Sequence, residues 1–159
     1  MANANEYGEA ESPGPLEVLL VDDSPGDVRL MREALKGVNR AVHLHVASDG
    51  VEAIAFLKRE GVYANAPRPD LTLLDLNMPR MDGREVLARM KHDDSLKSIP
   101  IVILTTSDSE GDIEKSYQLH ANSYLCKPVQ FAAFETLVKS INDFWLTKAK
   151  LPASPVGTQ

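Results

Sequence analysis

Three aspartates, a threonine and a lysine each come directly after a short predicted strand in this sequence. They are Asp22, Asp23, Asp75, Thr105 and Lys127. Carboxylate oxygens with no cysteine or paired histidine beside them are ligands for a hard divalent cation such as Mg²⁺. A lysine and a hydroxyl could hold a phosphoryl oxygen while a carboxylate accepts the phosphoryl group. If these groups share one site, they predict phosphoryl transfer to an aspartate, with Asp75 as the acceptor.

Asp75 ends the most distinctive stretch of the chain. Leu71–Leu74 is almost continuously apolar and is bounded by turn residues, which predicts a fully buried strand. Asp75 follows it and comes just before Asn77 and Pro79. Taken alone, this aspartate is equally well explained as a cap of the following turn. The other strand ends decide between the two interpretations.

The rest of the chain alternates between predicted strands and helices. Apolar runs predict strands at residues 16–21, 42–47, 71–74, 100–104 and 122–126. Helical spacing of apolar residues predicts helices at residues 24–38, 49–61, 83–91, 109–120 and 130–146. Strict alternation favours an α/β fold, with a parallel sheet covered by helices on both faces. Right-handed, short connections favour a doubly wound, flavodoxin-like sheet of strand order 2-1-3-4-5.

In such a sheet the carboxyl ends of the strands meet at one edge, near the switch in strand order. The five groups are therefore expected to lie together. Three carboxylates in one pocket repel one another and need a counter-charge. That charge could be a proton, Lys127 or a divalent cation.

Composition restricts the class of protein. The 159 residues suffice for one domain, expected over residues 16–146 between a disordered tail at 1–15 and a C-terminal tail at 147–159. A net charge of -6 argues against a nucleic acid or an anionic membrane as partner. No apolar stretch could span a bilayer, no signal peptide is evident, and the single cysteine, Cys126, forms no internal disulfide. A cytoplasmic location is expected.

The chain resembles the receiver domain of two-component response regulators over residues 16–146. The residues that carry the resemblance are Asp22-Asp23, Asp75, Met78-Pro79, Gly83, Thr105 and Lys127-Pro128. It implies a CheY-like fold. It also implies that the protein is not an enzyme with a separate substrate, but a phosphoacceptor domain that assists its own phosphorylation and dephosphorylation.

The resemblance also implies a metal site and a phosphoacceptor. Asp75 would take its phosphoryl group from the phosphohistidine of a sensor histidine kinase. Asp23 and Asp75 would bind Mg²⁺ (or Mn²⁺) directly, together with the backbone carbonyl of Asn77. Asp22 would hold the metal through water.

Further roles follow from the same resemblance. Lys127 would bind a phosphoryl oxygen, and its bond to Pro128 is expected to be cis. Thr105 would move toward the phosphoryl group, and Tyr124 would turn inward with it. The residue after the switch threonine is usually small in the family, but here it is Thr106. A β-branched side chain there predicts slow dephosphorylation by water.

Several stretches resemble the stand-alone response regulators of bacterial and cyanobacterial phytochromes. They are residues 66–71, 77–80, 105–107, 116–124 and 144–146. The implied partner is a phytochrome histidine kinase. The implied assembly is a homodimer through the helix at 109–120, the strand at 122–126, the helix at 130–146 and the C-terminal segment.

The candidate dimer surface consists of Tyr117, His120, Phe144, Trp145 and Leu146. Phe144 and Trp145 are adjacent and cannot both face one core, so one is expected to be exposed at an interface. The few residues after Leu146 cannot form a DNA-binding domain, so the expected output is a protein surface.

Two alternatives remain open from the sequence. A Mg²⁺-dependent phosphatase of the haloacid dehalogenase type also uses a strand-end aspartate, but it needs an acidic residue where this chain has Asn77 and a cap insertion. A receiver-like module that binds without phosphorylation is the other alternative. His43 and His45 lie on one face of an expected edge strand and are interpreted as surface residues, and Cys126 as a buried thiol.

Overall fold

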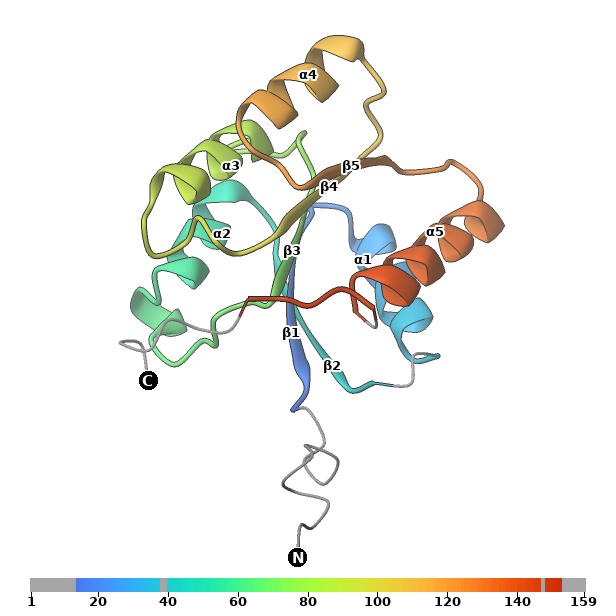
Figure 1. Cartoon of the computed structure of the whole chain (residues 1–159), viewed down its shortest axis with the longest axis horizontal. Helices are drawn as coiled ribbons and strands as arrows, with labels where there is room; N and C mark the ends of the chain where they lie inside the picture. Colours follow the sequence, from blue (N-terminus) through green and yellow to red (C-terminus); the bar gives the residue numbers. More distant parts are fainter. Residues whose placement is uncertain (1–13, 38–39, 147, 153–159) are drawn as a thin grey trace, which may run out of the picture.

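The computed structural model describes residues 14–37, 40–146 and 148–152, which form a five-stranded parallel sheet between two layers of helices (Figure 1). The strands are β1 (Leu16–Val21), β2 (Val42–Ala47), β3 (Leu71–Leu74), β4 (Ile101–Thr105) and β5 (Ser123–Cys126). Their order is β2-β1-β3-β4-β5, which confirms the predicted topology. Most of both predicted tails lies outside the described residues.

The helices are α1 (Pro25–Leu35), α2 (Gly50–Leu57), α3 (Gly83–His92), α4 (Glu110–Gln118) and α5 (Phe131–Phe144). A short 3₁₀ helix, η2 (Gly61–Tyr63), lies where the sequence predicts the end of a helix and a loop. Helices α1 to α4 each begin at a side-chain cap, provided by Ser24, Asp49, Asp82 and Ser109. Each cap satisfies a backbone N–H of the first turn, which stabilises a helix by about 1 kcal/mol.

Apolar side chains fill both faces of the sheet. Leu19 and Val21 of β1 pack toward α2 and α3, whereas Val18 and Leu20 pack toward α1 and α5. Strands β1, β3 and β4 are therefore buried almost throughout, which is why they are mostly apolar; their polar residues are Glu17, Thr72 and Thr105. Helix α4 lies at the β5 end of the sheet, beside α3 (Figure 1).

Two glycines bring the loop after β3 close to its neighbours. A Cβ on Gly83 would lie 2.0 Å from the backbone oxygen of Asp75, and a Cβ on Gly50 would lie 2.1 Å from that of Met81. Neither position has room for a side chain. The start of α3 therefore packs directly on the backbone of Asp75, which fixes the position of the predicted phosphoacceptor.

Candidate functional site

The predicted residues meet at the carboxyl edge of the sheet. The ammonium of Lys127 donates hydrogen bonds to Asp22 Oδ2 at 2.7 Å and to Asp75 Oδ2 at 3.0 Å. The backbone N–H of Lys127 also donates to the carbonyl of Thr105 at 2.7 Å, which holds the end of β5 against the end of β4. The side chains that directly follow β1, β3 and β5 thus share one buried cluster.

Asp27 belongs to this cluster, and sequence reasoning missed it. Its Oδ2 lies 2.8 Å from Lys127 Nζ, across 100 positions of sequence. In the sequence it looks like an ordinary acidic residue in the first turn of a helix, where it complements the dipole. One signal could have revealed it. Helix α1 begins only two residues after Asp23, so its first turn must lie over the same edge of the sheet.

The lysine stays charged because its partners outweigh its burial. Burial alone would lower the pKa of Lys127, but its hydrogen bonds to Asp22 and Asp27 and the charge of Asp75 raise it above the usual value. Burial raises the pKa of Asp22, and the bond to Lys127 opposes that rise only in part. The cluster therefore stores unfavourable negative charge that a cation could neutralise.

A carboxylate oxygen from each of Asp22, Asp23 and Asp75 lies within 4.8 Å of the others, as metal ligands require. Asp22 and Asp75 are buried, whereas Asp23 is exposed and leaves the group open to solvent on one side. With Asp27, which also bonds Lys127, four carboxyl groups and a single ammonium lie in and beside this group. An all-oxygen, strongly acidic donor set fits a hard divalent cation.

The two oxygens of Asp75 have different neighbours. Oδ2 accepts from Lys127, and Oδ1 accepts from the backbone N–H of Asn77 at 3.3 Å. The side chain of Asp75 is 10% exposed, so only a small part of it meets solvent. Asn77 is exposed in the loop after β3, two residues after Asp75.

The side chains of Thr105 and Tyr124 make no hydrogen bond to the cluster among the described residues. Thr105 is fully buried, and its hydroxyl has no hydrogen-bond partner among the described residues. The half-buried Tyr124 donates its hydroxyl proton to the carbonyl of Ser107 at 2.9 Å. Burial raises the pKa of Tyr124, which keeps the hydroxyl a donor. Thr106, next to Thr105, is exposed.

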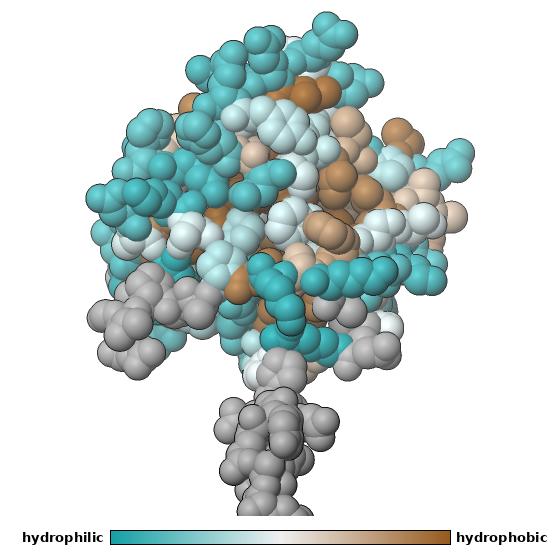
Figure 2. All heavy atoms as spheres, in the orientation of Figure 1, coloured by the Kyte–Doolittle hydropathy of each residue, from teal (hydrophilic) through white to brown (hydrophobic). Residues whose placement is uncertain are grey.

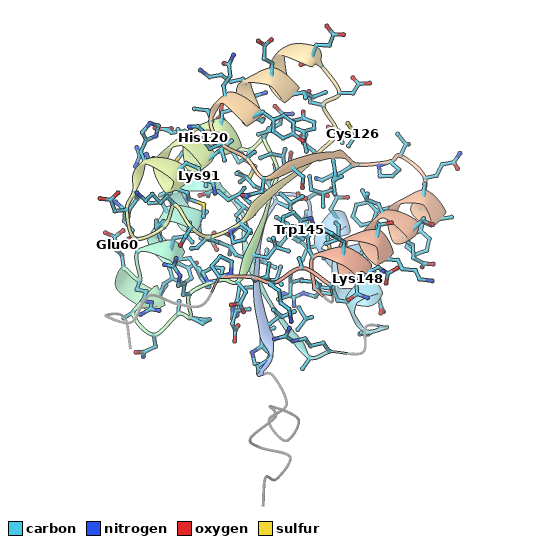
Figure 3. All side chains as sticks on the ribbon, viewed as in Figure 1. Glu60, Lys91, His120, Cys126, Trp145 and Lys148 are labelled. Atoms are coloured by element: carbon cyan, nitrogen blue, oxygen red, sulfur yellow. The ribbon has the colours of Figure 1, made fainter. Side chains whose placement is uncertain are left out.

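Three expectations are wrong. No peptide bond in the described part of the chain is cis, so the Lys127–Pro128 bond is trans. The cis and trans isomers of a bond before proline differ in free energy by only about 0.5–1 kcal/mol, so the residue types alone do not determine which isomer forms. Cys126 is exposed at the end of β5, an edge strand, and its thiol contacts the carbonyl of Ser107 (Figure 3). Leu146 is only 3% exposed because the chain after α5 folds it into the core beside α1 and α5, which removes it from the candidate dimer surface.

The other members of the candidate dimer surface are accessible. Tyr117, His120 and Phe144 are exposed, while Trp145 is half-buried and packs edge-on against Phe144 with ring centroids 5.5 Å apart. The expectation that one of the two aromatic neighbours is exposed is confirmed. Figure 2 shows apolar surface gathered between α4 and α5, whereas the side of α2 and α3 in this view is mainly hydrophilic.

The two histidines of β2 are engaged by a neighbouring carboxylate. His43 Nδ1 lies 2.9 Å from Glu17 Oε1, and His45 Nε2 lies 2.6 Å from Glu17 Oε2. Strand β2 is an edge strand, as predicted. Contacts with Glu17 across β1 and β2 account for both histidines without a metal. Within the described ranges, no helix is long and apolar enough to cross a membrane.

Comparison with known proteins gives consistent matches. The family profile of the response regulator receiver domain matches residues 18–141. Response regulator Rcp1 of Synechocystis sp. is 48% identical over 144 residues, which cover 91% of this chain and 98% of Rcp1. The probable methanogenesis regulatory protein FilR2 of Methanothrix harundinacea is 36% identical over 137 residues, covering 86% of this chain and 87% of FilR2.

Solved structures give the same result. The phosphorylated cyanobacterial phytochrome response regulator RcpA has a TM-score of 0.86 and 48% identity, and the alignment covers 88% of this chain and 100% of RcpA. The Mn²⁺-bound form of Rcp1 has a TM-score of 0.85 and 48% identity, with 87% of this chain and 100% of Rcp1 covered. The bacteriophytochrome response regulator AtBRR has a TM-score of 0.69 and 40% identity over 89% of this chain and 100% of its own.

Proposed function

This chain belongs to the family of response regulator receiver domains, and on that premise we propose that it accepts a phosphoryl group on Asp75 from the phosphohistidine of a sensor histidine kinase. The observation that carries the proposal is the contact of Lys127 with Asp75 and Asp22, beside three converging carboxylates. In this proposal Asp75 is the nucleophile, Lys127 binds the phosphoryl group, and the three carboxylates form the metal site, all within one small cluster.

In the proposed reaction a carboxylate oxygen of Asp75 attacks phosphorus, and the bond from phosphorus to the kinase imidazole nitrogen breaks. The electron pair of that bond stays on the imidazole. Lys127 gives up its hydrogen bond to one carboxylate and donates to a phosphoryl oxygen in its place. The hydroxyl of Thr105, which has no partner among the described residues, donates to another phosphoryl oxygen. Asp23, Asp75 and the backbone carbonyl of Asn77, with Asp22 acting through water, would hold a bound Mg²⁺ or Mn²⁺, which would supply charge neutralisation. Water later attacks the phosphorus of the acyl phosphate, the bond from phosphorus to the Asp75 oxygen breaks, and inorganic phosphate leaves with Asp75 restored as a carboxylate.

The proposed donor is a phytochrome histidine kinase. Support comes from RcpA and AtBRR, whose names identify them as phytochrome response regulators, and from the match along almost their whole length. We place the protein in the cytoplasm, where ATP charges such kinases, with residues 16–146 as the receiver and residues 1–15 and 147–159 as tails. The output is a protein-interaction surface.

We further propose a homodimer through α4, β5, α5 and the C-terminal segment. The exposed aromatic residues Tyr117 and Phe144, together with His120 and Trp145, lie on this side of the molecule. The apolar surface between α4 and α5 supports the same location (Figure 2). Light scattering over a dilution series tests it, and a monomer at every concentration would contradict the dimer.

The central experiment is labelling with a radioactive acyl phosphate. The protein should take up label only with Mg²⁺ or Mn²⁺, and Asp75→Asn should abolish the uptake. Label that survives in Asp75→Asn would overturn the assignment. Continuous turnover of a phosphate ester would instead favour a phosphatase of the haloacid dehalogenase type, which Asn77 disfavours. No uptake at all would favour a receiver-like binding module.

A further inference from the structure

A pocket of about 270 Å³ lies between the end of α2, the loop before β3 and the loop after α3. Its charged lining residues are three cations, Lys58, Arg59 and Arg68, and one carboxylate, Asp93. Figure 3 labels Glu60, the residue after Arg59, at this end of α2. These segments lie at the amino ends of β3 and β4, so the pocket is at the opposite edge of the sheet from the phosphoacceptor cluster.

The three cations of the pocket lack carboxylate partners. No carboxylate oxygen of the described residues lies within 4.0 Å of the side-chain nitrogens of Lys58, Arg59 or Arg68. Arg68 donates to two neutral oxygens, the carbonyl of Ser95 and the hydroxyl of Ser98, so three of its five N–H donors have no partner in the described structure. Burial and the nearby charge of Arg59 lower the pKa of Arg68, which shows that positive charge in the pocket is not fully balanced.

The carboxylates near the pocket are engaged by backbone and hydroxyl donors. Asp93 Oδ1 accepts from the backbone N–H of Ser95 at 2.8 Å and from its hydroxyl at 2.6 Å. Asp70, whose charge opposes the fall in the pKa of Arg68, accepts from the backbone N–H of Glu17 at 2.8 Å. Positive charge therefore exceeds negative charge in the lining, although the whole chain has a net charge of -6. Positive charge concentrated in one pocket of an acidic protein attracts anions.

The backbone of Arg59 is held in the left-handed region, with φ at 57°. It ends α2 in a turn where the N–H of Glu60 donates to the carbonyl of Ala55 at 2.9 Å, a position that glycine usually occupies. Residues with other side chains are strained there, and such strain gathers at ligand sites. Arg80 also has a positive φ, but its guanidinium pairs with Asp49 at 2.7 Å. No such pair among the described residues accounts for Arg59.

We propose that Lys58, Arg59 and Arg68 form a binding site for a phosphate anion, either free or carried as the ester of a small molecule. A phosphate group offers three acceptor oxygens and a charge of about -1.5 to -2, which matches three cations better than a single carboxylate does. The pocket has the volume of about nine waters, enough for a phosphate group and a few attached atoms. A second pocket of about 380 Å³ shares Lys58, Asp93 and Leu96 with it and could hold the rest of an ester.

The test is a titration with inorganic phosphate, followed by calorimetry and by backbone NMR shifts in a chelator. Phosphate should shift the amides of residues 57–60 and 93–96. Arg59→Gly should weaken its binding about tenfold, the usual effect of losing one charged hydrogen bond. The same variant should not lower the urea midpoint, because glycine adopts a positive φ without strain. If Arg59 had only a structural role, stability would change and phosphate binding would not.

Matched controls separate the pocket from general effects of charge. Arg80→Gly makes the same substitution as Arg59→Gly at another arginine of positive φ. Lys36→Ala matches Lys58→Ala, because each lysine directly follows a helix, where a cation complements the dipole. Lys58→Ala should weaken phosphate binding severalfold, whereas both controls should bind phosphate as the unmodified protein does. Glycerol phosphate and phosphate compared side by side distinguish a small ester from the free anion, and succinate should bind more weakly than either.

The phosphate site does not depend on the proposed function of Asp75, and the outcomes keep the two apart. Beryllofluoride with Mg²⁺ mimics the acyl phosphate, so Asp75→Asn should lose beryllofluoride binding but keep phosphate binding. If phosphate does not bind, or binds equally to the unmodified protein, Arg59→Gly and Lys58→Ala, the phosphate site is overturned and the phosphoacceptor assignment stands. Tighter binding of succinate would overturn the choice of phosphate. If the unmodified protein binds no beryllofluoride, the proposed function fails by itself.

Discussion

The ammonium of Lys127 lies 2.8 Å from the carboxylate of Asp27, so the proposed phosphoryl-binding lysine is tied to the first turn of α1. Lys127 also bonds Asp22 and Asp75, and three carboxylates thus compete for one ammonium. A phosphoryl group on Asp75 must draw the lysine away from at least one of them. Asp27 is the most exposed of the three and the easiest to displace.

Asp27→Asn should therefore speed phosphorylation. Removing this competitor leaves Lys127 bonded to Asp22 and Asp75, closer to where the phosphoryl oxygen arrives. We expect severalfold faster labelling by an acyl phosphate, with a change of no more than about 1 kcal/mol in the free energy of unfolding from the lost acid in the first turn. Glu33→Gln, which neutralises an exposed acid on the same helix, is the control and should label at the normal rate. Slower labelling of Asp27→Asn would show that Asp27 positions the lysine.

Lys127→Met should destabilise the protein in a metal-dependent way. The side chain of Lys127 is 4% exposed, and its removal leaves Asp22 and Asp75 buried without a counter-charge. Breaking a buried ion pair from one side costs about 3–5 kcal/mol of unfolding free energy. Urea unfolding in a chelator should show this loss, and Mg²⁺ should restore part of it by binding the folded state. A loss that Mg²⁺ leaves unchanged would argue against the three aspartates as a metal site.

Thr105→Val should stabilise the fold and impair the switch. The Thr105 hydroxyl is buried without a partner in the described structure, and removing such a group should raise the free energy of unfolding by about 1 kcal/mol. Thr72 in β3 is equally buried and equally unpaired, so Thr72→Val is a matched control. Both variants should gain stability in urea unfolding, but only Thr105→Val should bind beryllofluoride more weakly. Equal binding by the two variants would remove Thr105 from the switch.

The pKa of Asp112 gives a pH dependence with a defined sign. Ser107 and Arg84 hold that pKa below its usual value of 3.8 in the folded protein. The stabilisation from ionised Asp112 is therefore present above pH 3.8 and disappears as the pH falls through the lowered pKa. Asp112→Asn should reduce unfolding free energy most at neutral pH and progressively less below pH 3.8. A difference in stability that stays constant across this range would contradict the ionic role of Asp112.

The parts of this structure that the sequence predicts are those that local patterns determine. Leu71–Leu74 is buried on both faces and ends at Asp75, so an apolar run followed by a carboxylate identifies both the strand and the acceptor. The contact between Asp27 and Lys127 joins the first turn of α1 to the residue after β5, 100 positions away in the sequence, so the residue types around Asp27 do not reveal it by themselves. The burial of Leu146 depends on the path of the chain after α5, which no local pattern determines. The exposure of Cys126 follows from the edge position of β5, which the predicted strand order already implied.

Thr106→Ala should shorten the lifetime of the phosphorylated protein. Thr106 is exposed directly after the fully buried Thr105, so its β-branched side chain lies outside the core, next to the residue expected to meet the phosphoryl group. A smaller side chain there should admit water more readily and speed loss of phosphate severalfold. The measurement is the decay of label from purified phosphorylated protein in Mg²⁺, with Thr136→Ala, an exposed threonine of α5, as control. Decay no faster than in the unmodified protein would show that Thr106 does not restrict the attacking water.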